Sequence, residues 1–250
     1  MQRPQPYGPF HVAWVVGALL TVFLLRKKSG EKYTEKVFSI YGWTALVLEA
    51  LKQFSWSFSY NAQGVLVFDY QWYAAPFQMC TTPAYVAALY PFVRSVRARD
   101  ALRGYLAYFT LLASIAVALL PDTIFTDEVL INVHTSFLHM GGLFLSLWLL
   151  VSGRVTAKRD FWGGYRVFLC FIGIALLLNI VVYHAFDLGA SGEFFDMFYI
   201  SPYYISVVPV FSTLDRLLPY PVFLFLYLLA FLIGGALIAL AEEGVRRLAA

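Results

Sequence analysis

Seven stretches of the sequence are long and apolar enough to cross a lipid bilayer as helices, and this feature constrains the fold more than any other. A helix needs about 17 to 25 mostly apolar residues to span the hydrocarbon core. Charged residues make up only 13% of the chain and hydrophobic residues 60%, a composition typical of membrane proteins. The sequence therefore predicts an all-α, polytopic integral membrane bundle of seven transmembrane helices, with residues 1–250 forming one domain. The runs cover residues 9–25, 37–55, 72–93, 104–120, 129–151, 165–184 and 220–241.

Lys and Arg residues are unevenly distributed between the loops, and this distribution predicts an orientation. Most of the 18 basic residues lie in segments 26–36, 94–103 and 154–166 and at the C-terminus, all on one side of the predicted bundle. The positive-inside rule places this side in the cytoplasm, so we expect the N-terminus outside and the C-terminus inside. Anionic lipid at the inner leaflet is a sufficient partner for these loops, and no nucleic-acid partner is expected.

The first apolar run is expected to be a membrane span rather than a cleavable signal, because its basic cluster follows the apolar stretch. The expected location is the cytoplasmic membrane of a bacterium. The composition and loops predict neither a soluble domain nor a particular protein partner.

Polar and ionisable side chains within the runs gather toward the outer side. Such groups are costly in a bilayer, so each of these residues is a candidate for a functional role. At 1.5 Å of rise per residue they lie about 8 to 15 Å below the outer surface, on four different helices. This distribution predicts a cavity open to the outside. The residues are Glu49, Gln78, Cys80, His134, His139 and Asn179.

Several of these residues also have a simple structural interpretation. Glu49 stands three residues before Lys52 and four before Gln53, which is the spacing of an internal ion pair on one helix face. His134 could be an ordinary packing histidine. Cys80 alone could be a small buried hydrophobic residue. These alternatives remain open at the level of the sequence.

The two prolines around Cys80 favour a functional role for its thiol. Pro76 and Pro83 each remove a backbone donor, and a membrane tolerates such breaks only where protein or water satisfies the freed carbonyls. A thiol near a base and some water can become a nucleophile. His134 and His139 are five residues apart, which does not match the spacing of zinc hydrolases, so no metal and no cofactor is predicted.

Three segments together resemble a known family. They are the second run with Glu49, the segment APFQMC at 75–80 and the segment HTSFLHMGG at 134–142. Their order resembles the YwaF-like bacterial integral membrane proteins, which are related to animal transmembrane protein 164, an acyltransferase acting on ether phospholipids. The family's third span reads like Leu-Pro-Leu-His-Leu-Cys, so Pro76 and Cys80 match, whereas Gln78 replaces a histidine. The fifth-span histidine of the family, which glycine follows directly, corresponds best to His139.

The resemblance implies acyl transfer with membrane phospholipid as the substrate. Cys80 would form an acyl-thioester, with His139 as general base and then general acid. Gln78 or His134 would donate to the developing oxyanion. The residues expected to bind the substrate are Glu49, Gln78, His134 and Asn179. A lipase-like enzyme with the same nucleophile is a close variant. The alternative is a protein that binds or transports a lipid or another small molecule without reaction.

The external segment 185–219 is long and rich in Phe and Tyr, and it contains Pro202 and Pro209. Aromatic side chains with a polar tip suit the headgroup layer. We therefore expect this segment to lie in the outer interface over the cavity. It would act either as a passive anchor or as a lid that excludes water from Cys80.

Overall fold

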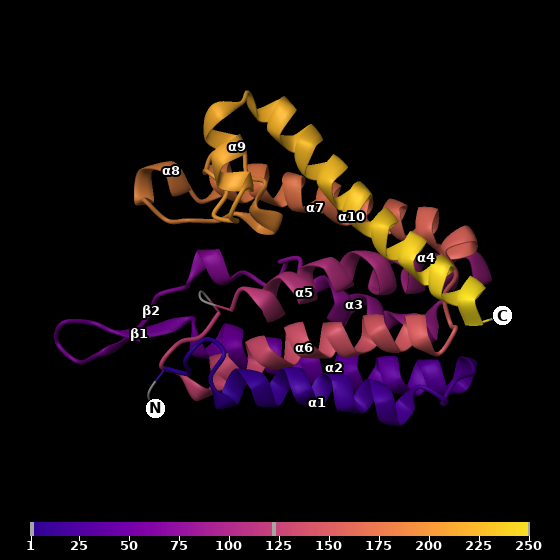
Figure 1. Cartoon of the computed structure of the whole chain (residues 1–250). Helices are drawn as coiled ribbons and strands as arrows, with labels where there is room; N and C mark the ends of the chain where they lie inside the picture. Colours follow the sequence, from indigo (N-terminus) through magenta and orange to yellow (C-terminus); the bar gives the residue numbers. More distant parts are fainter. Residues whose placement is uncertain (1–2, 122–123, 250) are drawn as a thin grey trace.

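The computed structural model describes residues 3–121 and 124–249, which form an elongated helical bundle (Figure 1). Helix accounts for 72% of the described residues. The elements are α1 (Pro9–Leu25), α2 (Glu31–Ser55), β1 (Phe58–Tyr60), β2 (Leu66–Phe68), η1 (Trp72–Ala74), α3 (Thr82–Leu89), η2 (Tyr90–Phe92), α4 (Val96–Gly104), η3 (Tyr105–Phe109), α5 (Thr110–Leu119), α6 (Val129–Val151), α7 (Ala157–Ala185), α8 (Leu188–Ser191), η4 (Met197–Tyr199), α9 (Phe211–Leu217) and α10 (Tyr220–Ala249).

Four helical stretches of the described chain are long and apolar enough to cross a membrane, which makes this an integral membrane protein. They are the continuous stretch Val96–Leu119, formed by α4, η3 and α5, then α6, α7, and Tyr220–Leu248 of α10. Helix α1 is apolar but shorter, with 17 residues. Helix α2 has 25 residues but also bears charged side chains. Seven membrane crossings therefore stay a prediction.

The predicted boundaries hold for two helices, since α1 and α6 cover residues 9–25 and 129–151 as expected. The runs at 37–55, 165–184 and 220–241 lie within the longer helices α2, α7 and α10. The helical stretch that contains most of the predicted run 104–120 begins earlier than predicted, at Val96, the first residue of α4.

The predicted third span, residues 72–93, is not one helix with breaks at Pro76 and Pro83. This segment consists of η1, irregular residues, the eight-residue helix α3 and η2. Pro83 lies in the first turn of α3, where a missing backbone donor costs little. Cys80 therefore lies just before a helix N-terminus and not between two kinks of one helix.

The prediction of an all-α fold is also wrong in one detail, because β1 and β2 form an antiparallel hairpin. Phe58 pairs with Phe68 and Tyr60 with Leu66. The Asn61 side chain accepts hydrogen bonds from two backbone amides of the turn, at 3.0 and 2.9 Å, and Gly64 supplies a left-handed residue with φ of 74°. Asparagine and glycine favour such turns because both tolerate this conformation. The hairpin projects from one end of the bundle (Figure 1).

The chain termini lie at opposite ends of the bundle. The N-terminus shares its end with the hairpin and with α8, whereas α10 ends at the other (Figure 1). Helix α6 packs against α1, α2 and α5, while α7 packs against α4 and α10. The buried core between them is rich in large side chains, among them Trp148, Tyr90, Tyr105, Phe109 and Phe168.

Helices α4 and α7 approach each other closely through glycines. A Cβ atom on Gly164 would lie 2.4 Å from the backbone carbon of Gly104 and 2.5 Å from the Tyr105 nitrogen. Such contacts leave no room for any side chain. Small residues at crossings are a common way for membrane helices to gain close packing.

We predict that Gly164→Ala destabilises the protein, by roughly 1–3 kcal/mol or more, because the added methyl group meets backbone atoms. Gly173→Ala is the matched control, since Gly173 lies on the same helix with open space around its Cα. It should be neutral or slightly stabilising, because alanine favours helix over glycine. Thermal unfolding of the detergent-solubilised proteins measures both. Equal melting temperatures for the two variants would contradict the close crossing.

Candidate active site

A buried polar cluster is centred on the Glu49 carboxylate of α2. Glu49 is only 3% exposed. Its two oxygens meet the Lys52 Nζ at 2.7 Å, the Gln53 Nε2 at 2.7 Å and the His134 Nε2 of α6 at 2.7 Å. The internal ion pair expected from the helical spacing is thus confirmed. The contact with His134 joins α2 to α6.

The same cluster extends to the segment that leads to Cys80. Lys52 Nζ and Gln53 Nε2 both donate to the carbonyl oxygen of Ala74, at 2.9 and 2.7 Å. The Tyr70 hydroxyl donates to the Gln53 Oε1 at 2.9 Å. The last residue of η1 is therefore tied to the charged groups of α2, which places the following residues beside them.

Cys80 is partly buried at the start of α3. Its Sγ lies 3.9 Å from the Thr81 Oγ1. The thiol is within electrostatic range of Lys52 and Glu49. Among the described residues, no hydrogen bond joins Cys80 to either histidine of α6. Cys80 therefore lies close to the charged cluster without being bonded to it.

The two histidines of α6 have different surroundings. His134 is 4% exposed; its Nε2 is paired with Glu49, while its Nδ1 is buried with no hydrogen-bond partner in the described chain. His139 is partly buried and lies within electrostatic range of His134. No described residue forms a hydrogen bond with the His139 ring. His134 is held in the cluster through its Nε2 atom, whereas its Nδ1 atom and the His139 imidazole have no hydrogen bond within the described chain.

Gln78 and Asn179, both predicted to bind substrate, instead hold the backbone of segment 196–198. Gln78 Nε2 donates to the Asp196 carbonyl at 2.9 Å, and the Phe198 amide donates to the Gln78 Oε1 at 3.0 Å. Asn179 pairs with Met197 in the same way, with distances of 3.0 and 2.7 Å. No observation tests whether they bind a substrate. The side chains of both residues are hydrogen-bonded to the backbone of residues 196–198.

The middle of segment 185–219 is therefore buried inside the bundle. Met197, Phe198 and Ile200 have no exposed surface, and Asp196 is equally enclosed. One Asp196 oxygen accepts from the Ser201 amide at 2.8 Å, and the other has no partner in the described chain. Burial raises the pKa of Asp196 to about 7. The sequence did not predict this insertion, because aromatic residues suit both an interface and a core.

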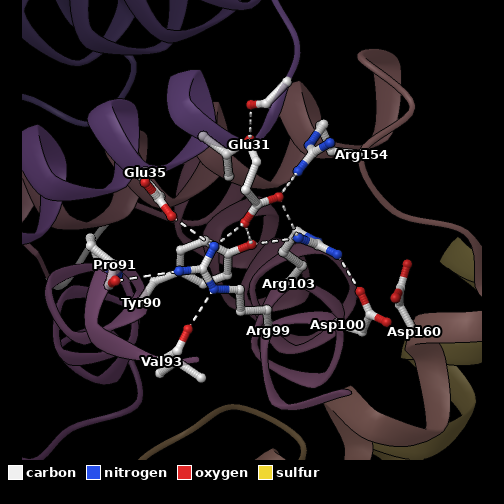
Figure 2. A network of polar contacts seen from close by, with 12 residues as sticks. Glu31, Glu35, Tyr90, Pro91, Val93, Arg99, Asp100, Arg103, Arg154 and Asp160 are labelled. Atoms are coloured by element: carbon white, nitrogen blue, oxygen red, sulfur yellow. Dashed lines mark hydrogen bonds and ion pairs between the residues drawn. The ribbon is translucent and has the colours of Figure 1, made fainter. Parts of the chain in front are cut away.

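A second charged network, which the sequence reasoning missed, lies around Glu31 at the start of α2 (Figure 2). The Glu31 carboxylate accepts from Arg99 at 2.8 Å, from Arg103 at 3.2 Å and from the Tyr90 hydroxyl at 2.7 Å. Arg154 also donates to it. This network joins α2, η2, α4 and the connection between α6 and α7. The signal in the sequence was the presence of acidic residues such as Glu31, Glu35 and Asp100 among the basic residues of this side.

Two of the hollows in the surface of the described residues are lined by none of the predicted site residues. One, of about 350 Å³, is apolar and lies between α1 and α6. The other is polar and lies near the hairpin, where the Trp56 Nε1 donates to Glu128. A cavity open over Cys80 therefore stays a prediction. In the described part of the chain, no group of three or more His, Cys, Asp or Glu side chains could hold a metal ion.

The comparison with protein families gives one match. The family model described as the TMEM164 family matches residues 6–239. No curated protein and no solved structure matches the chain.

We predict that Glu49→Gln destabilises the protein by about 3–5 kcal/mol, because it leaves the Lys52 charge buried without its counter-charge. The double variant Glu49→Gln with Lys52→Met should recover much of this loss. Glu243→Gln is the control, since the Glu243–Arg247 pair is exposed and such pairs contribute at most about 1 kcal/mol. Thermal unfolding in detergent measures all three. A double variant no more stable than Glu49→Gln would contradict the pairing.

Proposed function

The chain belongs to the TMEM164 family, and we propose that it is a membrane-embedded acyltransferase acting on phospholipid through Cys80. The observation that supports this most is the position of the thiol. Cys80 lies before a helix N-terminus, within electrostatic range of Lys52 in a buried polar cluster. The Lys52 charge and the helix N-terminus favour the thiolate, which is the nucleophilic form, while burial and the Glu49 carboxylate oppose it, so the proposed reaction needs a base to take the thiol proton.

The proposed reaction has two halves. The Cys80 sulfur attacks the ester carbonyl of a phospholipid, its proton passes to a histidine, and the carbonyl electron pair moves to oxygen. The tetrahedral intermediate then collapses, the carbon–oxygen ester bond breaks, and the histidine protonates the departing lysophospholipid. An acceptor alcohol, such as an ether lysophospholipid, takes the acyl group from the thioester by the reverse sequence. With water as acceptor the same site would act as a lipase.

His139 is the proposed general base. Its ring forms no hydrogen bond within the described chain, so a nitrogen is available to accept a proton. His134 is already paired with Glu49 at 2.7 Å. The proposal requires the bound substrate or a water molecule to bring the thiol and His139 into proton-transfer contact. Catalytic hydrogen bonds often tighten only in the complex.

We predict that Cys80→Ala and Cys80→Ser abolish acyl transfer, because each removes the nucleophile. Cys170→Ser is the matched control, since Cys170 is exposed on α7, and this variant should transfer at the wild-type rate. The assay follows transfer from diacyl phosphatidylcholine to an ether lysophospholipid in mixed micelles. Transfer at the wild-type rate by both Cys80 variants would refute the nucleophile assignment.

The proposed orientation places the N-terminal end of the bundle outside and the C-terminus in the cytoplasm. Single cysteines in a background without Cys80 and Cys170 test it. We predict that Ala62→Cys, in the hairpin turn, reacts with an impermeant maleimide in intact cells. Ser29→Cys, in the loop between α1 and α2, should react only after permeabilisation. The reverse labelling pattern would invert the orientation.

A second candidate function is lipid binding or transport without reaction. The observation that favours it is the apolar groove of about 350 Å³ between α1 and α6, lined by small and aromatic residues such as Gly17, Trp14 and Phe144. Such a groove suits an acyl chain. This candidate predicts that lipid copurifies with the protein and that the Cys80 variants retain as much of it as wild type, with no acyl transfer by any of them.

A further inference from the structure

The polar hollow near the hairpin has a volume of about 340 Å³ and lies at the end of the bundle that holds the N-terminus (Figure 1). Pockets for small ligands begin at about 300 Å³. Three parts of the chain supply its walls, namely the entry to the hairpin, the segment that leads into η1 and the connection into α6. The lining residues are Trp56, Phe58, Gln71, Tyr73, Thr126 and Glu128, which include one carboxylate and no basic side chain.

Hydrogen bonds to the backbone fix the walls of this hollow. The Gln71 amide donates to the Trp56 carbonyl oxygen at 3.1 Å, which ties two of the three parts together. The third part is held by the buried side chain of Asn132 on α6. Its Oδ1 accepts from the Thr126 amide and its Nδ2 donates to the Thr126 carbonyl oxygen, both at 2.8 Å. The hollow is therefore built by the fold and does not depend on mobile surface side chains.

The Glu128 carboxylate is held beside aromatic rings. The Trp56 Nε1 donates to both of its oxygens, at 3.0 and 3.2 Å. The Trp56 and Tyr73 rings are 5.6 Å apart between centroids, with an angle of 50° between their planes. Within the described chain, this single N–H is the hydrogen-bond donor that the carboxylate meets. A carboxylate has about four acceptor sites, so most of them stay open to a ligand.

A carboxylate among aromatic rings is suited to an organic cation. The faces of Trp, Tyr and Phe rings attract ammonium groups, and quaternary ammonium ligands are often bound in this way. The exposed Glu128 adds a full negative charge. Lys52 lies one turn before Trp56 but does not neutralise that charge, because its Nζ is bonded to Glu49 and to the Ala74 carbonyl. The hollow therefore favours a cation that comes from outside the chain.

We propose that this hollow binds the ammonium group of a zwitterionic phospholipid, either choline or ethanolamine, and so selects the headgroup of the substrate. In the proposed orientation the hairpin end faces outward, which places the hollow on the side of the outer-leaflet headgroups. Tyr73 directly precedes Ala74, whose carbonyl is tied to the charged cluster near Cys80. The inference rests on the proposed function, because it takes the bound lipid to be the one whose ester Cys80 attacks.

The test measures lipid retention by the full-length protein with Cys80→Ala, so that no acyl transfer alters the lipids. The protein is incubated in detergent with equal amounts of phosphatidylcholine, phosphatidylethanolamine and phosphatidylglycerol of one acyl composition, washed, and its bound lipids are quantified by mass spectrometry. We expect phosphatidylcholine, phosphatidylethanolamine or both to be retained in excess over phosphatidylglycerol, which has the phosphate but no ammonium group. Adding Glu128→Gln should lower this preference about 3- to 10-fold.

Matched variants separate the hollow from the rest of the surface. The glutamine at position 128 can still accept from the Trp56 N–H, so the melting temperature should not change. Asp127→Asn removes the same charge from the neighbouring exposed residue outside the hollow, and it should keep the preference. Tyr73→Leu should lower the preference about threefold. Tyr60→Leu removes an exposed tyrosine of the hairpin outside the hollow and should leave it unchanged.

The possible outcomes also separate this inference from the function on which it rests. Equal retention of the three lipids, or equal effects of Glu128→Gln and Asp127→Asn, would overturn the headgroup site. The proposed function still stands in that case if wild type transfers acyl groups and Cys80→Ala does not. If the preference is present and is lost with Glu128→Gln while wild type transfers no acyl group, the headgroup site holds and the proposed function fails.

Discussion

The buried carboxylate of Glu49 is the constraint on which the arrangement of the site depends. An ionised carboxylate inside a membrane bundle costs several kcal/mol unless it is paired and hydrogen-bonded. Its donors come from α2 itself and from His134 of α6, so satisfying this one group fixes how the two helices pack. Two of the donors, Lys52 and Gln53, also hold the Ala74 carbonyl. The pairing of Glu49 thereby determines where the segment leading to Cys80 begins.

The other side of that segment is held by the turn at 196–200. Gln78 and Asn179 supply side-chain amides that replace the hydrogen bonds a regular helix or strand would make. Irregular backbone at membrane depth is tolerated only where protein or water satisfies it. Polar contacts on both sides therefore explain why residues 75–81 can be non-helical beside a thiol. In this view the prolines permit the irregular segment, whereas the amide and charge contacts give it a defined shape.

Much of the helical framework could be predicted, because bilayer thickness dictates the length of an apolar run. The limits of α1 and α6 follow from this rule, and the Glu49–Lys52 pair follows from helical spacing alone. The contact between Glu49 and His134 could not be predicted, since it depends on how α2 and α6 pack. For the same reason Gln78 could be recognised as a polar group needing a partner, but not as the partner of a turn 118 positions away along the chain. Segment 72–93 could be recognised as a broken span from Pro76 and Pro83, but not the extent of its irregular backbone, because its hydropathy suits a buried irregular segment as well as a helix.

Intact-protein mass spectrometry tests most directly whether Cys80 accepts an acyl group from phospholipid. The purified wild-type protein is incubated with diacyl phosphatidylcholine of one acyl composition, without an acceptor, and its mass is measured before and after hydroxylamine. We predict a mass gain of one acyl chain, removed by hydroxylamine as expected for a thioester, present in Cys170→Ser and absent in Cys80→Ala. No adduct on the wild-type protein, or an equal adduct on Cys80→Ala, would contradict acylation of Cys80.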